Sequence, residues 1–148
     1  MRPLLLALAA LALLIVPVMA QTDAGTDATL DLEMGDHMAF RAAFEAIQAA
    51  VVAGDAIALA EYIPFGEPIT VNGQSRVFPD ADAFVAAYGE IFTPDVVEAV
   101  VAQTYTTLFV NSEGVMFGNG EVWIGGLCND AACDSFDVKI LAIQSTRE

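Results

Sequence analysis

Residues 104–145 read TYTTLFVNSEGVMFGNGEVWIGGLCNDAACDSFDVKILAIQS. This stretch decides the fold, because β-branched and aromatic residues recur through it between turn-forming segments. We expect three strands, at residues 105–110, 115–124 and 136–145, with a turn at 111–114. Gly118-Asn119-Gly120 interrupts the long strand, either as a bulge that bends it or as a tight hairpin turn of its own. We favour the bulge, because residues 111–114 already supply a turn of the right length.

A helical pattern lies upstream of this stretch. Four apolar residues fall on one helix face, at i, i+4, i+7 and i+11: Phe40, Phe44, Ile47 and Val51. Asp36 is a suitable N-cap and Gly54 a suitable C-terminal stop. A second, shorter helix is expected from Asp55 to Ile63, where Pro64 ends it.

A hairpin and two more helices separate these elements from the terminal strands. Residues 68–78 predict two short strands joined by Asn72-Gly73, the dipeptide that best tolerates positive φ in a tight turn. The next helix opens at Pro79-Asp80 and carries an apolar face of Phe84, Tyr88, Ile91 and Phe92. The last helix starts at Thr93-Pro94, with Thr as the N-cap and Pro at the first helical position.

This order of elements predicts an α+β fold, in which N-terminal helices pack on one face of a curved antiparallel sheet. Residues 36–148 have the length of a single domain. Residues 21–35 are small, polar and acidic without an apolar period, so we expect a disordered acidic linker there.

Residues 1–20 predict a cleavable signal peptide. Arg2 supplies a positive charge, residues 4–16 are apolar, and Val18 and Ala20 place small residues at positions −3 and −1. The alternative is a membrane-spanning helix, which needs about 20 apolar residues, whereas Pro17 ends the run early. No cysteine near residue 20 could carry a lipid. We therefore expect an exported protein, periplasmic or secreted, without membrane association once the leader is removed.

The chain is strongly acidic, with 20 Asp and Glu against five Lys and Arg. Residues 1–20 contain one of the basic residues and no acid, so the expected mature chain has a net charge of −16. This charge argues against nucleic acid or anionic lipid as a partner, since both bind clustered Lys and Arg. It is compatible with a basic protein or a cationic ligand, and also with solubility alone. A small-molecule ligand and a homodimer are the other partners that we consider.

Cys128 and Cys133 are the two cysteines of the chain, and in an exported protein such a pair predicts a disulfide. A redox pair or half of a metal site are the alternatives. Redox centres usually have Cys-x-x-Cys at a helix start, and a zinc site would need two more soft ligands. We expect a structural disulfide.

Several short segments resemble one known fold family. They are Ala53-Gly54-Asp55, Ile91-Phe92-Thr93-Pro94, Leu108-Phe109-Val110-Asn111, Gly114-Val115-Met116 and Gly118-Asn119-Gly120-Glu121-Val122-Trp123. With the order of elements, they resemble the nuclear transport factor 2-like (polyketide-cyclase-like) fold and a set of small exported bacterial proteins of unknown function within it. The resemblance covers residues 36–145 and implies a cone of helices wrapped by a bent sheet around a pocket. The family holds isomerases, cyclases, dehydratases and binding domains, so no single activity is implied. Three terminal strands are expected here where that family usually has four.

The sequence contains no catalytic, metal or cofactor signature. His37, the single histidine, follows Asp36, but adjacent helical residues point apart, so an exposed histidine near a helix start explains the pair. Acidic groups that could bind calcium occur in two places, Asp80 with Asp82 and Asp130 with Asp134 and Asp137, and neither fits a calcium-loop pattern. Nucleophile and phosphate-loop motifs are likewise missing.

Six residues are candidates to line a pocket inside the cone: Tyr62, Arg76, Tyr88, Tyr105, Glu121 and Trp123. Their alternative role is to fill the core, with polar tips bonded at its rim. Three functions follow. The favoured one is a non-enzymatic ligand-binding or interaction module. The second is a pocket enzyme, isomerase- or dehydratase-like, that moves a proton through Tyr88, Glu121 or His37. The third is an inhibitor of a basic cell-wall hydrolase such as lysozyme.

Overall fold

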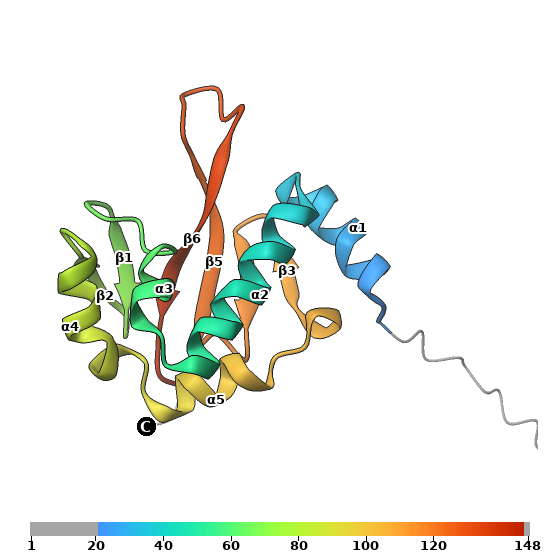
Figure 1. Ribbon diagram of the computed structural model, residues 1–148. Coiled ribbons are helices and arrows are strands. Elements are labelled where there is room, and N and C mark those ends of the chain that lie inside the picture. Colours follow the sequence, from blue (N-terminus) through green and yellow to red (C-terminus); the bar gives the residue numbers. More distant parts are fainter. Residues whose placement is uncertain (1–20, 147–148) are drawn as a thin grey trace, which may run out of the picture.

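The computed structural model describes residues 21–146 and confirms the α+β class (Figure 1). Its elements are α1 Asp23–Met34, α2 His37–Ala53, α3 Ala56–Ala60, β1 Pro68–Val71, β2 Gln74–Val77, α4 Ala81–Ile91, α5 Pro94–Ala102, the 3-10 helix η1 Tyr105–Thr107, β3 Phe109–Asn111, β4 Gly114–Phe117, β5 Val122–Cys128 and β6 Phe136–Ile143. The expected signal peptide, residues 1–20, lies outside the described part. Within the described part, no helix is long and apolar enough to cross a membrane.

The segment expected to be a disordered linker is helix α1, and that prediction is wrong. Thr22 caps the helix by accepting a hydrogen bond from the Gly25 N–H, and Gly35 ends it in the left-handed conformation. Thr26 and Leu30 are buried four residues apart. One narrow stripe of this kind gives almost no apolar period, which is why the sequence pattern does not reveal it.

Helix α2 matches the prediction. The Asp36 carboxylate accepts hydrogen bonds from the N–H groups of Met38 and Ala39, and Gly54 ends the helix with positive φ. The predicted apolar face is buried, with exposures of 4% or less: Phe40, Phe44, Ile47 and Val51. The caps at the two ends and the apolar stripe between them therefore set the limits and the orientation of the longest helix.

The remaining helices and the hairpin also form where the sequence predicts them. Asp55 and Asp80 cap α3 and α4 through their side chains. Thr93 precedes α5, with Pro94 in its first turn, but its hydroxyl donates to the Asp95 carboxylate and accepts no hydrogen bond from the helix backbone. Between β1 and β2, Asn72 and Gly73 both have positive φ, as a tight two-residue hairpin turn requires.

The C-terminal half forms four strands where three were expected. Residues 105–107 are a turn of 3-10 helix, so the first of these strands, β3, is shorter than predicted. Residues 118–121 form a hairpin loop between Phe117 and Val122, which face each other across β4 and β5. The prediction of a bulge there is wrong, and the alternative of a separate hairpin is correct. Positive φ at Gly118 and Gly120 lets the chain reverse direction within this loop.

The six strands form one sheet in the order β2-β1-β6-β5-β4-β3. Every neighbouring pair is antiparallel except β1 and β6, which run parallel at Thr70↔Ala142 and Val71↔Ile143. The sheet is therefore mixed and open, and the expectation of a wholly antiparallel sheet is wrong. The hairpin of β1 and β2 extends the same sheet because it pairs with the last strand.

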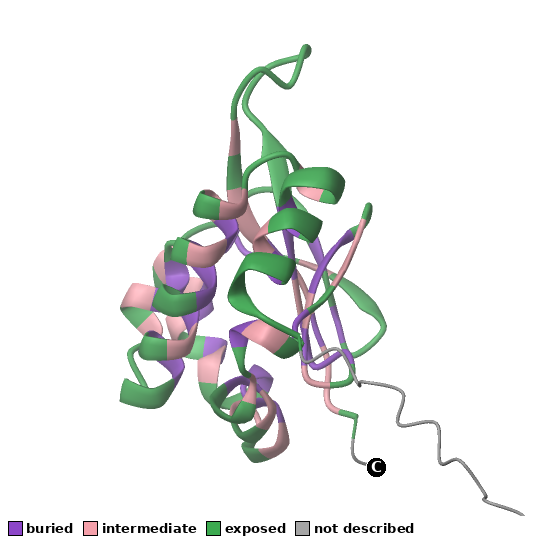
Figure 2. Cartoon of the chain, turned by 90° about the vertical axis from the view of Figure 1, so that its right-hand side faces the viewer, coloured by how far each residue is buried: buried purple, intermediate pink, exposed green. Residues whose placement is uncertain are grey.

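The hydrophobic core lies between the helices and one face of this sheet. Figure 2 shows the helices gathered on that side of the strands, with the buried residues between the two layers. Aromatic rings occupy the centre of the core: Phe44 stacks on Phe117 with centroids 5.3 Å apart, and Phe84 meets Phe78 edge to face. Side chains thus fill the space in which a cone would hold its pocket.

Candidate functional site

The six pocket candidates do not converge. Tyr88 belongs to the core, where its ring stacks on Phe92 at 5.1 Å. Arg76 lies on β2, where its guanidinium pairs with Glu90 at 3.1 Å and covers the Phe78 ring.

The other four candidates lie in four further places. Tyr62 borders a surface hollow between α2 and β6, and Glu121 is buried in the β4–β5 loop. Trp123 lies on the sheet face opposite the helices, beside Phe109. Tyr105 is buried beneath α1 and α2. The expectation of one shared pocket is therefore wrong, because the core is packed where these side chains would have met.

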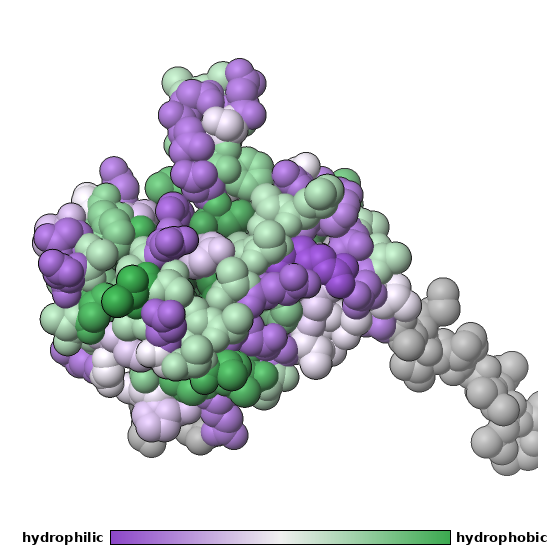
Figure 3. Space-filling model, viewed as in Figure 1, coloured by the Kyte–Doolittle hydropathy of each residue, from purple (hydrophilic) through white to green (hydrophobic). Residues whose placement is uncertain are grey.

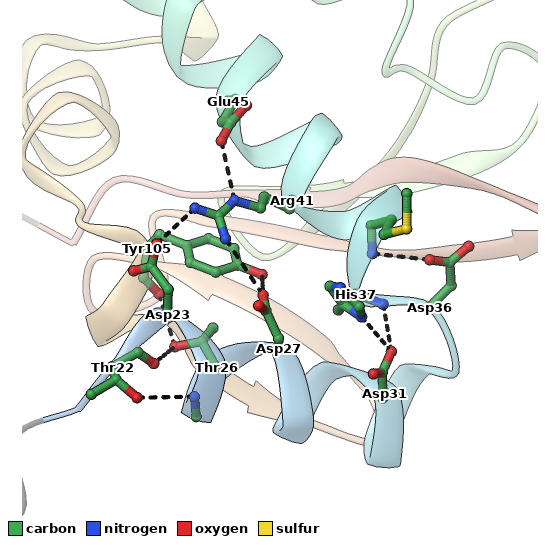
Figure 4. Close-up of polar contacts among 12 residues, drawn as sticks. Thr22, Asp23, Thr26, Asp27, Asp31, Asp36, His37, Arg41, Glu45 and Tyr105 are labelled. Carbon is green, nitrogen blue, oxygen red and sulfur yellow. Dashed lines mark hydrogen bonds and ion pairs between the residues drawn. The ribbon is translucent and has the colours of Figure 1, made fainter.

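Tyr105 belongs instead to a polar cluster that joins α1 to α2 (Figure 4). Its hydroxyl donates a 2.6 Å hydrogen bond to the Asp27 carboxylate, and the Arg41 guanidinium lies 4.4 Å from the centre of its ring. Arg41 also pairs with Asp23 at 2.7 Å and with Glu45 at 3.3 Å. We call these five residues the α1–α2 clamp.

The helical repeat explains the geometry of this clamp. Asp23, Asp27 and Asp31 are spaced four residues apart, so they form an acidic row along one side of α1. His37 and Arg41 have the same spacing on α2 and face that row. The two helices are thus joined through opposite charges and one buried tyrosine.

His37 pairs with Asp31, and its neighbour Asp36 caps the helix instead. The His37 Nδ1 lies 2.8 Å from the Asp31 Oδ1, which also accepts the His37 backbone N–H at 2.9 Å. Both side chains are largely open to solvent. Sequence reasoning missed this partner because it treated residues 21–35 as disordered.

The contacts in and beside the clamp shift the pKa values of four side chains: Tyr105, His37, Asp31 and Arg41. Burial and the Asp27 carboxylate raise the pKa of Tyr105 far above its usual range, so its hydroxyl stays protonated. The hydrogen bond to Asp31 raises the pKa of His37, and the bonds from His37 lower the pKa of Asp31. The hydrogen bond to Asp23 raises the pKa of Arg41. The Tyr105 hydroxyl donates to Asp27 and the His37 ring pairs with Asp31, so the contacts of this cluster join α1 to the rest of the domain.

Glu121 is a buried carboxylate with its oxygens already engaged. It accepts hydrogen bonds from the Asn119 backbone N–H and from the Thr146 hydroxyl. It borders a hollow of about 410 Å³ that also includes Asp95 and Glu98. Among residues 21–146, no three His, Cys, Asp or Glu side chains are placed to hold a metal ion.

The most prominent surface feature is an arm formed by the ends of β5 and β6, residues 126–138. Its strands pair from Gly126↔Val138 to Cys128↔Phe136, beyond the reach of β4, and it rises clear of the body in Figure 1. The predicted disulfide between Cys128 and Cys133 is confirmed and closes the tip, with the two Cα atoms 4.8 Å apart. The sequence predicted the disulfide but not the projection of the arm.

The fold and these sites define a class of protein: an open, mixed six-stranded sheet with helices on one face, a packed interior and a disulfide-closed arm. Comparison of the chain with models of protein families, with curated proteins and with solved structures finds no match.

Proposed function

We propose that this protein is an exported, non-enzymatic interaction module that binds a basic protein through the arm. The observation that carries the proposal is the arm itself, in which residues 126–135 are exposed on a hairpin fixed to the central strands of the sheet. The core is packed, and the six pocket candidates lie in separate parts of the molecule. These two observations support binding at the surface and not in an interior pocket.

The arm is ordered before any partner arrives. The Asn129 N–H donates to the Ser135 carbonyl at 2.9 Å. The Asp130 carboxylate accepts hydrogen bonds from the N–H groups of Ala132 and Asp134. The hydrogen bond from the Asp134 backbone N–H lowers the pKa of Asp130 below its usual value. A pre-ordered loop loses little conformational entropy on binding, which favours its use as a contact element.

The charge of the arm favours a basic partner. Residues 126–138 contain three aspartates and no Lys, Arg or His. Within residues 21–146, no hydrogen bond or ion pair reaches the carboxylates of Asp134 and Asp137, and Leu127, which is opposite Asp137 in the strand register, is 38% exposed. Figure 3 shows the arm as a largely hydrophilic projection from a more apolar body. The carboxylates of Asp134 and Asp137 would pair with Lys or Arg side chains of a partner, and Leu127 would contact an apolar side chain among them.

Export and the fold family belong to the same proposal. The signal-peptide pattern of residues 1–20 and the disulfide support a periplasmic or secreted location. Helices on one face of the sheet, and the fourth terminal strand, support a nuclear transport factor 2-like fold without an open pocket. The proton-transfer alternative has less support, since Tyr88, Glu121 and His37 lie in three separate environments.

Binding to lysozyme, a basic cell-wall hydrolase, tests the proposal, with cytochrome c as a basic protein of unrelated shape. In a surface-binding assay at physiological salt, the mature chain should prefer lysozyme. Asp134→Asn with Asp137→Asn should weaken binding about 2- to 30-fold, at about 0.2–1 kcal/mol for each exposed charge.

Two further variants complete the test. Glu33→Gln with Glu67→Gln removes the same charge from exposed body positions and should change binding little. Cys128→Ser with Cys133→Ser removes the disulfide that closes the tip. Closing a six-residue loop contributes about 2 kcal/mol on the chain-entropy model. Because the open tip must be ordered again on binding, we expect the affinity to fall about tenfold or more. Equal binding to both proteins, or equal effects of the two charge variants, would show attraction by net charge alone and overturn the proposal.

A further inference from the structure

The sheet face opposite the helices carries an uncharged row of side chains across all six strands. Strand register places six residues side by side on this face: Phe109, Met116, Trp123, Ala142, Thr70 and Ser75. At about 4.8 Å between strands, the row is roughly 24 Å long. Phe109 is half exposed and meets the Trp123 ring edge to face, with centroids 6.2 Å apart.

Trp123, a partly exposed side chain, lines a surface hollow of about 320 Å³. The other lining residues are Thr70, Glu113, Leu141, Ala142 and Gln144. Glycines flank the indole, since a Cβ at Gly114 would lie 3.6 Å from its Cε3 and one at Gly120 would lie 3.7 Å from its Nε1. No side chain therefore rises beside the ring at these two positions, and the indole is left as a low platform.

The polar groups around this platform are unused. Within residues 21–146, no hydrogen bond or ion pair involves the side chains of Thr70, Glu113 or Gln144, or the Trp123 indole N–H. Every fully buried side-chain nitrogen or oxygen in that part of the chain has a partner, so the free indole N–H is open to solvent. An aromatic floor with a few unpaired donors and acceptors is the general form of a ligand site.

We infer that this hollow binds a neutral sugar ring of a glycan chain. A pyranose has apolar C–H faces that can lie on the indole and equatorial hydroxyls that can reach the hydroxyl, carboxylate and amide at the rim. A purely apolar ligand would leave those three groups dehydrated without partners. No Lys or Arg lines the hollow and the chain carries a net charge of −15, so an anionic ligand is disfavoured. The same charge disfavours a second copy of this chain on this face.

Trp123 is the single tryptophan of the chain, so intrinsic fluorescence reports on this site directly. The full mature chain is titrated with three neutral hexasaccharides: β-1,4-linked glucose, α-1,4-linked glucose and β-1,4-linked N-acetylglucosamine. At least one should give a saturable change in emission below millimolar concentration. By calorimetry, Gln144→Ala should weaken that binding about fivefold, at about 1 kcal/mol for a hydrogen bond, and Trp123→Ala by tenfold or more.

Gln74→Ala is the matched control, because Gln74 is an exposed glutamine on β2 outside the hollow, and this variant should bind like the wild type. Circular dichroism checks that Trp123→Ala folds. If this variant does not fold, the affinities of the wild type, Gln144→Ala and Gln74→Ala decide whether the hollow binds the sugar. No saturable response to any of the three sugars overturns the inference. Equal affinities of the two glutamine variants also overturn it, as does occupation of this face by a protein and not by a sugar.

Discussion

Removing the Tyr105 hydroxyl tests whether the α1–α2 clamp holds the first helix in place. In Tyr105→Phe the ring keeps its contacts with Phe44 and Arg41, and the change removes the 2.6 Å hydrogen bond to Asp27. A hydrogen bond to a charged group contributes about 1.5–3 kcal/mol. The Asp27 side chain is 25% exposed and can regain some hydration, so we expect a loss of about 1–2 kcal/mol. For a domain of this size that is roughly 4–8 °C in Tm.

The assay combines urea unfolding with hydrogen exchange of the α1 amides. Tyr88→Phe is the matched control, because within residues 21–146 the Tyr88 hydroxyl makes no hydrogen bond and its ring stacks on Phe92. We expect the free energy of unfolding to change by less than about 0.5 kcal/mol in the control. Tyr105→Phe should also speed amide exchange in α1 more than in α4. If the two variants unfold at the same urea concentration, or α1 exchange is unchanged, the clamp does not fix this helix.

Two further predictions concern the pH response and the backbone. Because Asp31 raises the His37 pKa above 6.5, the stabilisation by charged His37 is complete below about pH 6.5 and is lost as the pH rises through the raised pKa. The contribution of Asp31 is complete above about pH 3.8 and is lost as the pH falls through its lowered pKa. His37→Gln should therefore flatten the decline of Tm between pH 6 and 8.5, and NMR titration of this single histidine should give a pKa above 6.5; an unchanged slope would contradict the pairing. Gly114→Ala should destabilise by about 2–5 kcal/mol, since its φ is +152° and a Cβ would lie 2.5 Å from the Ile124 carbonyl oxygen. Gly89→Ala, at an exposed position of α4, should instead stabilise the protein by about 0.5–1 kcal/mol. Thermal melts in which both glycine variants shift Tm in the same direction would refute this reasoning.

Local signals in the sequence predicted most of the elements correctly. Asp36, Asp55 and Asp80 each cap the helix that their position indicated. Asn72-Gly73 forms the hairpin turn that its conformational preference favours. Each of these features depends on interactions between residues at most four positions apart, so a single sequence contains the whole cause.

Predictions failed where the cause lies between distant segments. Helix α1 carries one thin apolar stripe, and part of its stabilisation comes from Arg41 on α2 and from Tyr105, which lies 78 residues after Asp27. The turn at residues 118–120 could have been a bulge on local grounds. The hairpin is chosen because Phe117 and Val122 face each other and both are buried in the core.

The sequence by itself determined where α2 to α5 begin, the caps at Asp36, Asp55 and Asp80, the tight hairpin, the cysteine pair and the acidic charge. These properties follow from dihedral preferences, side-chain periodicity and composition, which act over a few residues. Only the tertiary structure decided that β1 pairs in parallel with β6, that the interior is filled and that the arm projects. It also placed a partly exposed tryptophan on the outer face of the sheet. The physical reason is that burial and strand pairing depend on contacts between segments distant in the sequence, and a local sequence pattern does not specify which segments come into contact.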